Sequence, residues 1–363
     1  MLASDDIKSQ ARSLGFDVCG VAPAVAHPEL AFLETWLGKG YAGEMRYMTR
    51  TASRRADVRQ VLRSARSVVV LGTVYNTDQP YSVESADPER ADISRYAWGA
   101  DYHDVVGRRT RALLEWMRAA SPEPFEAKPY VDTGPVQERV YAQHAGLGWI
   151  GKNTCVINPE LGSWIFLSEI ICSLPLTTDA PALDQCGTCT LCLEACPTGA
   201  IVEAGVLDAT RCLSYFTIEL GGGIPDSVRS DVASHVYGCD ICQDVCPWNA
   251  VAPTSDDECW QPHPVLDRPK LTELWRQPDD VLGPVVERSA MSHAGVRRLR
   301  RNVAVALGNN PSSEVDAVLA EPTADDSKND PLVADHVEWA RARQPRQGHR
   351  RREDGLPRRV HDE

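Results

Sequence analysis

Residues 186–197 read CGTCTLCLEACP, a run of four cysteines that ends in a Cys-Pro pair. Bacterial ferredoxins show this spacing, in which three thiolates hold one 4Fe-4S cluster and the fourth ligates another cluster. A second run follows at Cys239, Cys242 and Cys246, again with proline after the last cysteine, but Val236 stands where its first cysteine would be. The two runs predict a module that binds two 4Fe-4S clusters.

The incomplete second run needs one more thiolate, and Cys212 is the nearest cysteine outside both runs. Because the cysteine before each proline ligates the other cluster, we predict two ligand sets. The first set is Cys186, Cys189, Cys192 and Cys246, and the second is Cys196, Cys212, Cys239 and Cys242. Structural zinc and disulfides are the alternatives, but zinc sites usually show two CxxC pairs or Cys/His pairs instead of a triple run.

The composition is that of a folded protein with two or three domains, since the 363 residues are 43% hydrophobic and 25% charged. The net charge of −13 does not favour a nonspecific nucleic-acid binder, although it leaves room for a local basic patch. Eight of the twelve cysteines lie within residues 186–246, and the first ten residues lack the basic and apolar regions of a signal peptide. We therefore expect a soluble, cytoplasmic protein without a membrane helix. In such a reducing compartment, clustered cysteines favour metal binding.

The rest of the chain divides by pattern into three further parts. Strands expected at residues 67–75 and 129–132, with a helix at 105–119 between them, indicate an α/β domain over residues 1–180. The cysteine module occupies residues 181–250, and a helical pattern without strand signals covers residues 270–340. Residues 341–363 are rich in arginine and are expected to be disordered. The cysteines outside the module are expected to be small buried hydrophobes, namely Cys19, Cys155, Cys172 and Cys259.

Asp132 follows a predicted strand within the stretch VDTGP, where α/β sheets often place ligands and catalytic groups. The alternative is that Asp132 caps a helix over residues 137–144.

The glycine-dense stretch 146–153 either lets the backbone approach a flat ligand or forms an ordinary tight turn. Residues 101–107, DYHDVVG, nearly match the DxHxxG loop that supplies histidine to cobalt in some cobalamin proteins, but capping is the commoner use of such residues at a helix start.

Several longer stretches together resemble the epoxyqueuosine reductases, cobalamin- and iron–sulfur-dependent enzymes that complete queuosine synthesis in tRNA. These stretches are RYAWGADYH at 95–103, YVDTGPVQER at 130–139, GLGWIGKNT at 146–154, ELGSWIFLSEI at 160–170, CGTCTLCLEACPTGAI at 186–201, RCLSYFTIE at 211–219, YGCDICQDVCPWN at 237–249 and RRNVAVALGN at 300–309. RCLSYFTIE and YGCDICQDVCPWN are together more specific than any ferredoxin run. The resemblance covers most of residues 1–340 in order.

The resemblance implies an α/β domain, similar to that of reductive dehalogenases, that binds base-off cobalamin, so that His103 is not a cobalt ligand. It also implies a ferredoxin-like module that delivers electrons to cobalt, and a C-terminal HEAT-like helical domain that contacts tRNA. The family's proton donor falls on Asp132, and its second-cluster cysteine falls on Cys212. The implied cobalamin contacts are Arg55, Ser94, Asp132, Val156, Leu167 and Ser214.

The implied reaction reduces epoxyqueuosine to queuosine in tRNA with a GUN anticodon, and we expect a monomer with a separate electron donor. Asp132 must be protonated near neutral pH for this work, and burial beside a corrin is expected to raise its pKa. A basic patch within residues 288–301, which lack Asp and Glu, predicts tRNA contacts at Arg297, Arg298, Arg300 and Arg301. A solvated helix face is the alternative for that patch. A reductive-dehalogenase-like enzyme and an iron–sulfur electron carrier are the competing functions.

Overall fold

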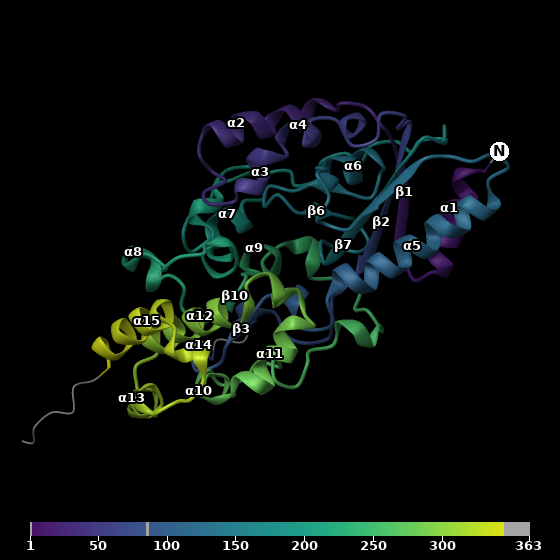
Figure 1. Ribbon diagram of the computed structural model, residues 1–363. Coiled ribbons are helices and arrows are strands. Elements are labelled where there is room, and N and C mark those ends of the chain that lie inside the picture. Colours follow the sequence, from purple (N-terminus) through teal and green to yellow (C-terminus); the bar gives the residue numbers. More distant parts are fainter. Residues whose placement is uncertain (1, 85–86, 345–363) are drawn as a thin grey trace, which may run out of the picture.

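The computed structural model describes residues 2–84 and 87–344, and the arrangement of their elements is shown in Figure 1. The strands are β1 Val18–Pro23, β2 Ser67–Val74, β3 Asp92–Ile93, β4 Ala127–Tyr130, β5 Trp149–Ile150, β6 Val156–Ile157, β7 Ile165–Cys172, β8 Ile201–Glu203, β9 Val206–Leu207 and β10 His235–Tyr237. The helices before the cysteine module are α1 Ser4–Ser13, α2 Phe32–Gly38, α3 Arg46–Arg50, α4 Ala52–Arg55, α5 Tyr102–Ala120 and α6 Glu138–His144. The later helices are α7 Leu191–Ala195, α8 Asp226–Arg229, α9 Ile241–Asp244, α10 Leu271–Arg276, α11 Asp279–Glu287, α12 Gly295–Asn309, α13 Ser313–Ala320, α14 Asp326–Asn329 and α15 Pro331–Ala342.

The N-terminal part is built on a four-stranded sheet with the strand order β1-β2-β7-β4. Its central strand β2 has the sequence SVVVLGTV and is buried along its whole length, as a strand covered on both faces must be. All three strand pairings in this sheet are antiparallel. The predicted strands and helices are therefore present, but the parallel-sheet rule that we used to place Asp132 does not apply.

Helices cover both faces of this sheet. Side chains of α1 and α5 pack with Val69, Leu71 and Ile170 on one face. On the other face, α6 and the N-terminal helical turns pack with Val68 and Val70. Figure 1 shows α5 and α1 on one side of the sheet and α6 with α2 and α4 on the other. The domain is thus a sandwich of helices around an antiparallel sheet.

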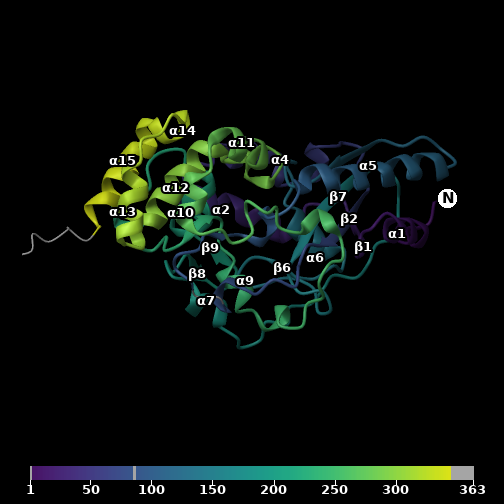
Figure 2. The ribbon, with the colours of Figure 1, turned by 90° about the horizontal axis from the view of Figure 1, so that it is seen from below.

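The cysteine module is poor in regular structure and is joined to the rest of the chain by a short parallel pairing of β3 with β10. Within the module, β8 and β9 form a small hairpin, and α7 and α9 contact each other. Figure 2 shows α7 and α9 lying away from the C-terminal helices, with β8 and β9 between. The pairing of β3 with β10 brings Ser94 and Arg95 beside the second cysteine run, where their N–H groups donate to the Tyr237 carbonyl at 2.8 Å and to Asp240 Oδ2 at 2.6 Å.

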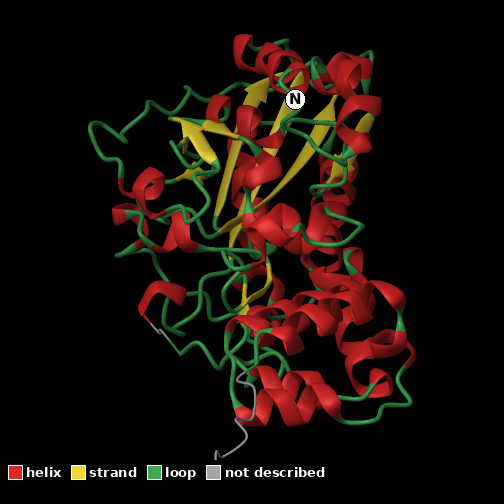
Figure 3. Cartoon of the chain, turned by 90° about the vertical axis from the view of Figure 1, so that its left-hand side faces the viewer, coloured by secondary structure: helices red, strands yellow, loops and turns green. Residues whose placement is uncertain are grey.

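The chain beyond residue 270 is helical, as predicted, and α12 lies at its centre. Residues 299–308 of α12 are all buried, because α10 and α15 pack on one side of this helix and the cysteine module packs on the other. The same hydrophobic core includes Ala97, Trp98 and Tyr237 from outside the helical region. Figure 3 shows the C-terminal helices stacked below the sheet. Their likeness to HEAT repeats stays a prediction.

Two further predictions concern the C-terminal tail and membrane-spanning helices. The expected disordered tail lies almost wholly outside the described residues, since α15 runs to Ala342 and residues 345–363 are not described. Among the described residues, every helix is too short or too polar to cross a membrane.

Candidate active site

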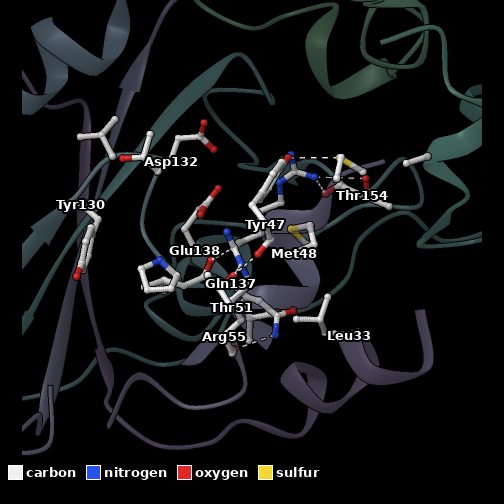
Figure 4. Close-up of a pocket in the computed structure, with 18 of the residues that line it drawn as sticks. Leu33, Tyr47, Met48, Thr51, Arg55, Tyr130, Asp132, Gln137, Glu138 and Thr154 are labelled. Atoms are coloured by element: carbon white, nitrogen blue, oxygen red, sulfur yellow. Dashed lines mark hydrogen bonds between the residues drawn. The ribbon is translucent and has the colours of Figure 1, made fainter. Parts of the chain in front are cut away.

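A cavity of about 1550 Å³ opens where the sheet domain, the cysteine module and the C-terminal helices meet. Pockets for single small molecules usually measure about 300–1000 Å³, so this cavity has room for more than one ordinary ligand. Its walls come from segments far apart in the chain, among them α3, α4, the start of α5, the turn before α6, and residues 212–219. Figure 4 shows Tyr47, Arg55, Asp132 and Glu138 around the cavity.

Asp132 lies on the cavity wall in a strained turn. Its φ of 55° falls in the left-handed region, and the N–H of Thr133 donates to the carbonyl of Val131 across it. Strained backbone of this kind is concentrated at functional sites. The alternative that Asp132 caps a helix is wrong, since α6 begins after Gln137 and has no side-chain cap.

Two side chains from the first turn of α5 hold the Asp132 carboxylate. Tyr102 Oη donates to Asp132 Oδ2 at 2.9 Å, and His103 Nε2 lies 3.4 Å from the same oxygen. On its other side, His103 Nδ1 lies 2.7 Å from Asp101 Oδ1, and Asp101 also caps α5 by accepting from the His103 N–H. Residues 101–107 therefore use the capping geometry, and they also place His103 against Asp132.

The charges around Asp132 set its protonation. Burial acts to raise its pKa, but hydrogen bonds from His103 and Tyr102 and the charge of Arg139 outweigh burial, so the pKa lies below the ordinary value. The expected upward shift assumes a corrin beside the carboxyl, and it stays a prediction. The pKa of His103 is raised to about 9, because its hydrogen bonds to Asp101 and Asp132 and their charges exceed the opposing effect of burial. At neutral pH the pair is an ion pair, with the proton on His103.

Two further acids lie behind Asp132. Burial and the charge of Asp132 raise the pKa of Glu138 to about 7. Burial, with the charges of Glu138 and Asp132, raises the pKa of Glu169 far above its ordinary value. Glu169 lies in β7, and neither of its carboxylate oxygens has a hydrogen-bond partner in the described part of the chain. Burial without a hydrogen-bond partner thus favours the neutral form of the Glu169 carboxyl.

The four cysteines of the first predicted ligand set lie together. Burial raises the pKa of Cys192 to about 11, and the nearby thiols of Cys246, Cys186 and Cys189 add to this rise. The Trp149 indole N–H donates to Cys186 Sγ at 3.3 Å, and Lys152 Nζ donates to the carbonyl of Cys189 at 2.8 Å. The hairpin of β5 and β6 thereby ties this set to the sheet domain.

The second predicted ligand set also lies together, and one member reaches the cavity. The pKa of Cys239 is raised by burial and then by Cys212 and Cys196, and Cys242 interacts in the same way with Cys239 and Cys212. Cys212 lines the cavity. Within residues 2–84 and 87–344, no three His, Cys, Asp or Glu side chains converge as ligands of a single metal ion. Thiolates are the ligands that hold 4Fe-4S clusters, so the donors of these two groups fit that cofactor.

The remaining cysteines only partly follow their prediction. Cys172 is fully buried, as expected, whereas Cys19, Cys155 and Cys259 are half-buried. Cys155 lies close to the second ligand set, because its charge affects the pKa of Cys242.

The glycine-dense stretch 146–153 is a close-packed turn, since a Cβ at Gly148 would lie 2.3 Å from the carbonyl oxygen of Ile157.

The predicted cobalamin contacts divide into two groups. Arg55, Asp132 and Ser214 line the cavity. Ser94, Val156 and Leu167 are outside its lining, and the first two are buried in the protein. Our sequence reasoning missed Glu138 and Arg139 as lining residues, although both lie in the quoted stretch 130–139.

The predicted tRNA contacts at Arg300 and Arg301 are wrong. Both side chains are 0% exposed. Arg300 donates to the carbonyls of Leu274, Trp275 and Gln277. Arg301 donates to the carbonyls of Phe216, Leu220 and Gly222. These guanidinium groups hold α12 to the end of α10 and to residues 216–222, and they cannot reach a phosphate.

The other two arginines of that patch are nearer the surface. Arg297 is 53% exposed and its Nε lies 2.7 Å from Asp330 Oδ2. Arg298 is half-buried and donates to the carbonyl of Ile218 at 2.6 Å. Contact of these two side chains with tRNA stays a prediction.

A second arginine-rich stretch was overlooked. Residues 46–66 contain seven arginines and a single acid, Asp57. Arg50 and Arg54 are exposed and line the cavity, as does Arg111 from α5. None of these three forms an ion pair with another described residue. The density of arginine in residues 46–66 was the available sequence signal.

Eight cysteines lie in two groups of four, and the wall of the adjoining cavity carries an acid, Asp132, paired with His103. These features are those of an iron–sulfur oxidoreductase. Residues 185–249 match the family model described as "4Fe-4S double cluster binding domain", and residues 55–133 match "Epoxyqueuosine reductase QueG, DUF1730". The epoxyqueuosine reductase of Pseudomonas aeruginosa is 41% identical over 340 residues, which are 93% of each chain. The chain belongs to the epoxyqueuosine reductase family.

Solved structures agree with this assignment. A crystal structure of epoxyqueuosine reductase with an epoxyqueuosine-modified stem loop of tyrosine tRNA matches with a TM-score of 0.84 and 29% identity, over 93% of this chain and 89% of that chain. A Bacillus subtilis structure, described as having its catalytic aspartate loop swung out of the active site, matches with a TM-score of 0.82 and 28% identity over 93% and 89%. The likeness to reductive dehalogenases stays a prediction.

Proposed function

We propose that this protein reduces epoxyqueuosine to queuosine in tRNA with a GUN anticodon. One observation carries the proposal: a thiol of the second ligand set, Cys212, and an acid held by Tyr102 and His103, Asp132, line the same large cavity. Reduction of an epoxide to an alkene consumes two electrons and two protons and releases water. The cavity thus brings a source of electrons and a source of protons to one space.

We propose that electrons cross the module through two 4Fe-4S clusters. Cys186, Cys189, Cys192 and Cys246 would hold the outer cluster, since none of them lines the cavity. Cys196, Cys212, Cys239 and Cys242 would hold the inner cluster, next to the cavity. A separate donor reduces the outer cluster, and the inner cluster passes single electrons onward.

Cobalamin is the group that we propose for the cavity. The volume of about 1550 Å³ allows a macrocycle together with a nucleoside, and Leu33, Trp36 and Met48 supply apolar wall. Arg55 and Ser214 are the lining residues that would hold it. When bound, cobalamin supplies a cobalt centre with the reducing and nucleophilic chemistry that an epoxide carbon requires.

The chain's own acid completes the reaction. Asp132 gives a proton to the epoxide oxygen as its C–O bond breaks, which is general-acid catalysis. The side chain of Asp132 is 55% exposed on the cavity wall, so it is accessible to a substrate there. Tyr102 fixes the carboxylate, because its Oη donates to Oδ2 at 2.9 Å.

Arginines at the cavity wall are suited to tRNA phosphates. Arg50, Arg54 and Arg111 are exposed, and none is paired with an acid among the described residues. Free guanidinium groups bind phosphate oxygens and release counterions, so the affinity for tRNA should fall steeply with salt. A tRNA substrate would place the reaction in the cytoplasm.

An anaerobic assay tests the function. Protein with intact clusters and added cobalamin is incubated with a strong reductant and tRNA that carries epoxyqueuosine, and nucleoside mass spectrometry detects loss of one oxygen atom. We expect conversion by the wild type and at least about 10²-fold slower conversion by Asp132→Asn. Asp280→Asn, a change at an exposed acid on α11, is the matched control. Absence of conversion by wild-type protein with verified clusters and cobalamin would refute the proposal.

A further inference from the structure

His103 lies between two carboxylates, one of which belongs to the proposed proton donor. Its Nδ1 is 2.7 Å from Asp101 Oδ1, and its Nε2 is 3.4 Å from Asp132 Oδ2. Asp101 is fixed in turn, because it caps α5 through the N–H of His103 at 2.9 Å. The imidazole therefore has one nitrogen anchored and the other directed at Asp132.

We propose that His103, oriented by Asp101, stores the proton that Asp132 delivers to the substrate oxygen. The inference rests on the proposed function and names residues that supply its acid. His103 acts through Asp132 and is therefore a positioning residue in this reaction, as is Asp101.

The protonation states require such a store. The pKa of Asp132 lies below its ordinary value, so the carboxylate alone carries no proton at neutral pH. A bound substrate and cofactor would remove water from its side chain, which is 55% exposed on the cavity wall. Desolvation disfavours charged forms, so filling the cavity favours the neutral pair over the ion pair.

The proton then moves in two steps that balance. It passes from His103 Nε2 to Asp132 Oδ2, which makes both side chains neutral. It passes next from Asp132 to the epoxide oxygen as the C–O bond breaks, which leaves Asp132 as a carboxylate. Neutral His103 regains a proton from solvent, to which its side chain is 31% exposed, and the second proton of the reaction can follow the same route.

Other titratable groups face this pair from the neighbouring elements, among them Glu169 on β7, whose pKa is raised in part by the charge of Asp132. Glu138 and Arg139 lie on α6, Tyr102 lies on α5, and the charge of Asp132 also affects Tyr47 on α3 and His293 near the C-terminal helices. The pKa values of both tyrosines are raised, so they stay neutral. The pKa of Glu138 is raised to about 7, below the value of about 9 for His103, so the two titrations are separable.

The first test measures the titration of His103 without any turnover. Nuclear magnetic resonance of the full chain with its clusters follows each imidazole, and the His103 signal is the one missing in His103→Gln. We expect a pKa of about 9 for His103 in the wild type, and a lower pKa in Asp101→Asn and in Asp132→Asn, because each change removes a negative partner. An ordinary pKa near 6.5 in the wild type would overturn the proposal.

The second test measures single-turnover rates against pH. We expect His103→Gln to react about 10²-fold more slowly at pH 7, with its rate rising as pH falls toward the pKa of the unpaired Asp132. Asp101→Asn should shift the loss of activity from about pH 9 to lower pH. His263→Gln, at an exposed histidine, should behave as the wild type.

The outcomes separate this inference from the proposed function. If the wild type converts epoxyqueuosine and His103→Gln keeps both its rate and its pH profile, the proton store is refuted while the function stands. If the wild type fails to convert, the function fails, and the resonance titration still decides whether His103 and Asp132 share a proton. A loss of rate in His103→Gln without any change in the pH profile would make the role structural and would also overturn the inference.

Discussion

Arg301 separates two interpretations, because the sequence pattern predicts a tRNA contact whereas the structure shows a buried side chain that binds backbone carbonyls. Its guanidinium donates to the carbonyls of Phe216 at 2.6 Å, Leu220 at 2.7 Å and Gly222 at 2.5 Å. It has no carboxylate partner among the described residues, and burial lowers its pKa to about 9, so it remains charged at neutral pH. These bonds close the π-helical turn Tyr215–Glu219 that follows Cys212 and forms part of the cavity wall.

The magnitude follows from the bonds that are lost. A hydrogen bond from a charged donor contributes about 1.5–3 kcal/mol, and disruption of a buried charged network typically costs about 3–5 kcal/mol. We therefore expect Arg301→Ala to destabilise the fold by about 3–5 kcal/mol. At roughly 2 °C per kcal/mol for a large chain, the melting temperature should fall by about 6–10 °C. Arg301→Lys keeps a charge but has no fork to span three carbonyls, so its loss should be intermediate.

Differential scanning calorimetry and iron analysis provide the assay. Arg297→Ala is the matched control on the same helix, where an exposed ion pair with Asp330 should contribute less than about 1 kcal/mol. If Arg301→Ala melts with the wild type and instead weakens tRNA binding with a smaller salt dependence, Arg301 contacts RNA and the structural reasoning is wrong.

Three further predictions address the clusters, the cavity wall and the sheet. Cys212→Ser should lose about half of the bound iron and keep the outer cluster; loss of all iron on elemental analysis would contradict the two ligand sets. Arg54→Ala should weaken tRNA binding and lower the slope of log affinity against log salt by about 1, whereas an unchanged slope in filter-binding assays would remove Arg54 from the interface. Glu169 has a raised pKa in the folded protein, so its protonation stabilises the fold below the unfolded value of about 4.5, and this contribution is lost as pH rises toward the folded value. Glu169→Gln should therefore gain stability relative to the wild type between pH 5 and pH 8 in melting experiments, and a constant difference across that range would mean that Glu169 is ionised.

The parts of the site that could be predicted are those encoded by local spacing. Cysteine spacing predicted two groups of thiols, each drawn from both runs, and the members of each group lie close together. Counting the unassigned cysteines then supplied Cys212. Asp132 and His103 were both noticed, but their meeting was not, since residues 101–103 and 132 are joined only by the packing of α5 against the sheet.

The errors arose where tertiary packing decides the outcome. A continuous apolar strand such as β2 is buried on both faces, but its sequence does not reveal whether its neighbours are parallel or antiparallel. Arg300 and Arg301 resemble a surface patch because arginines without nearby acids are typical of an exposed helix face, whereas residues 299–308 of α12 are all buried. The cysteine module packs on the second face of that helix. The sequence of the helix itself does not indicate that this face is buried.

The left-handed backbone at Asp132 limits which residues evolution or an engineer could place there. With a φ of 55°, the position is open to glycine and, among other residues, chiefly to asparagine and aspartate. Glutamate, the nearest chemical equivalent as an acid, would have to adopt a backbone conformation that its side chain disfavours. The turn therefore favours aspartate over glutamate at this position, and a homologue with glutamate here would need a different loop.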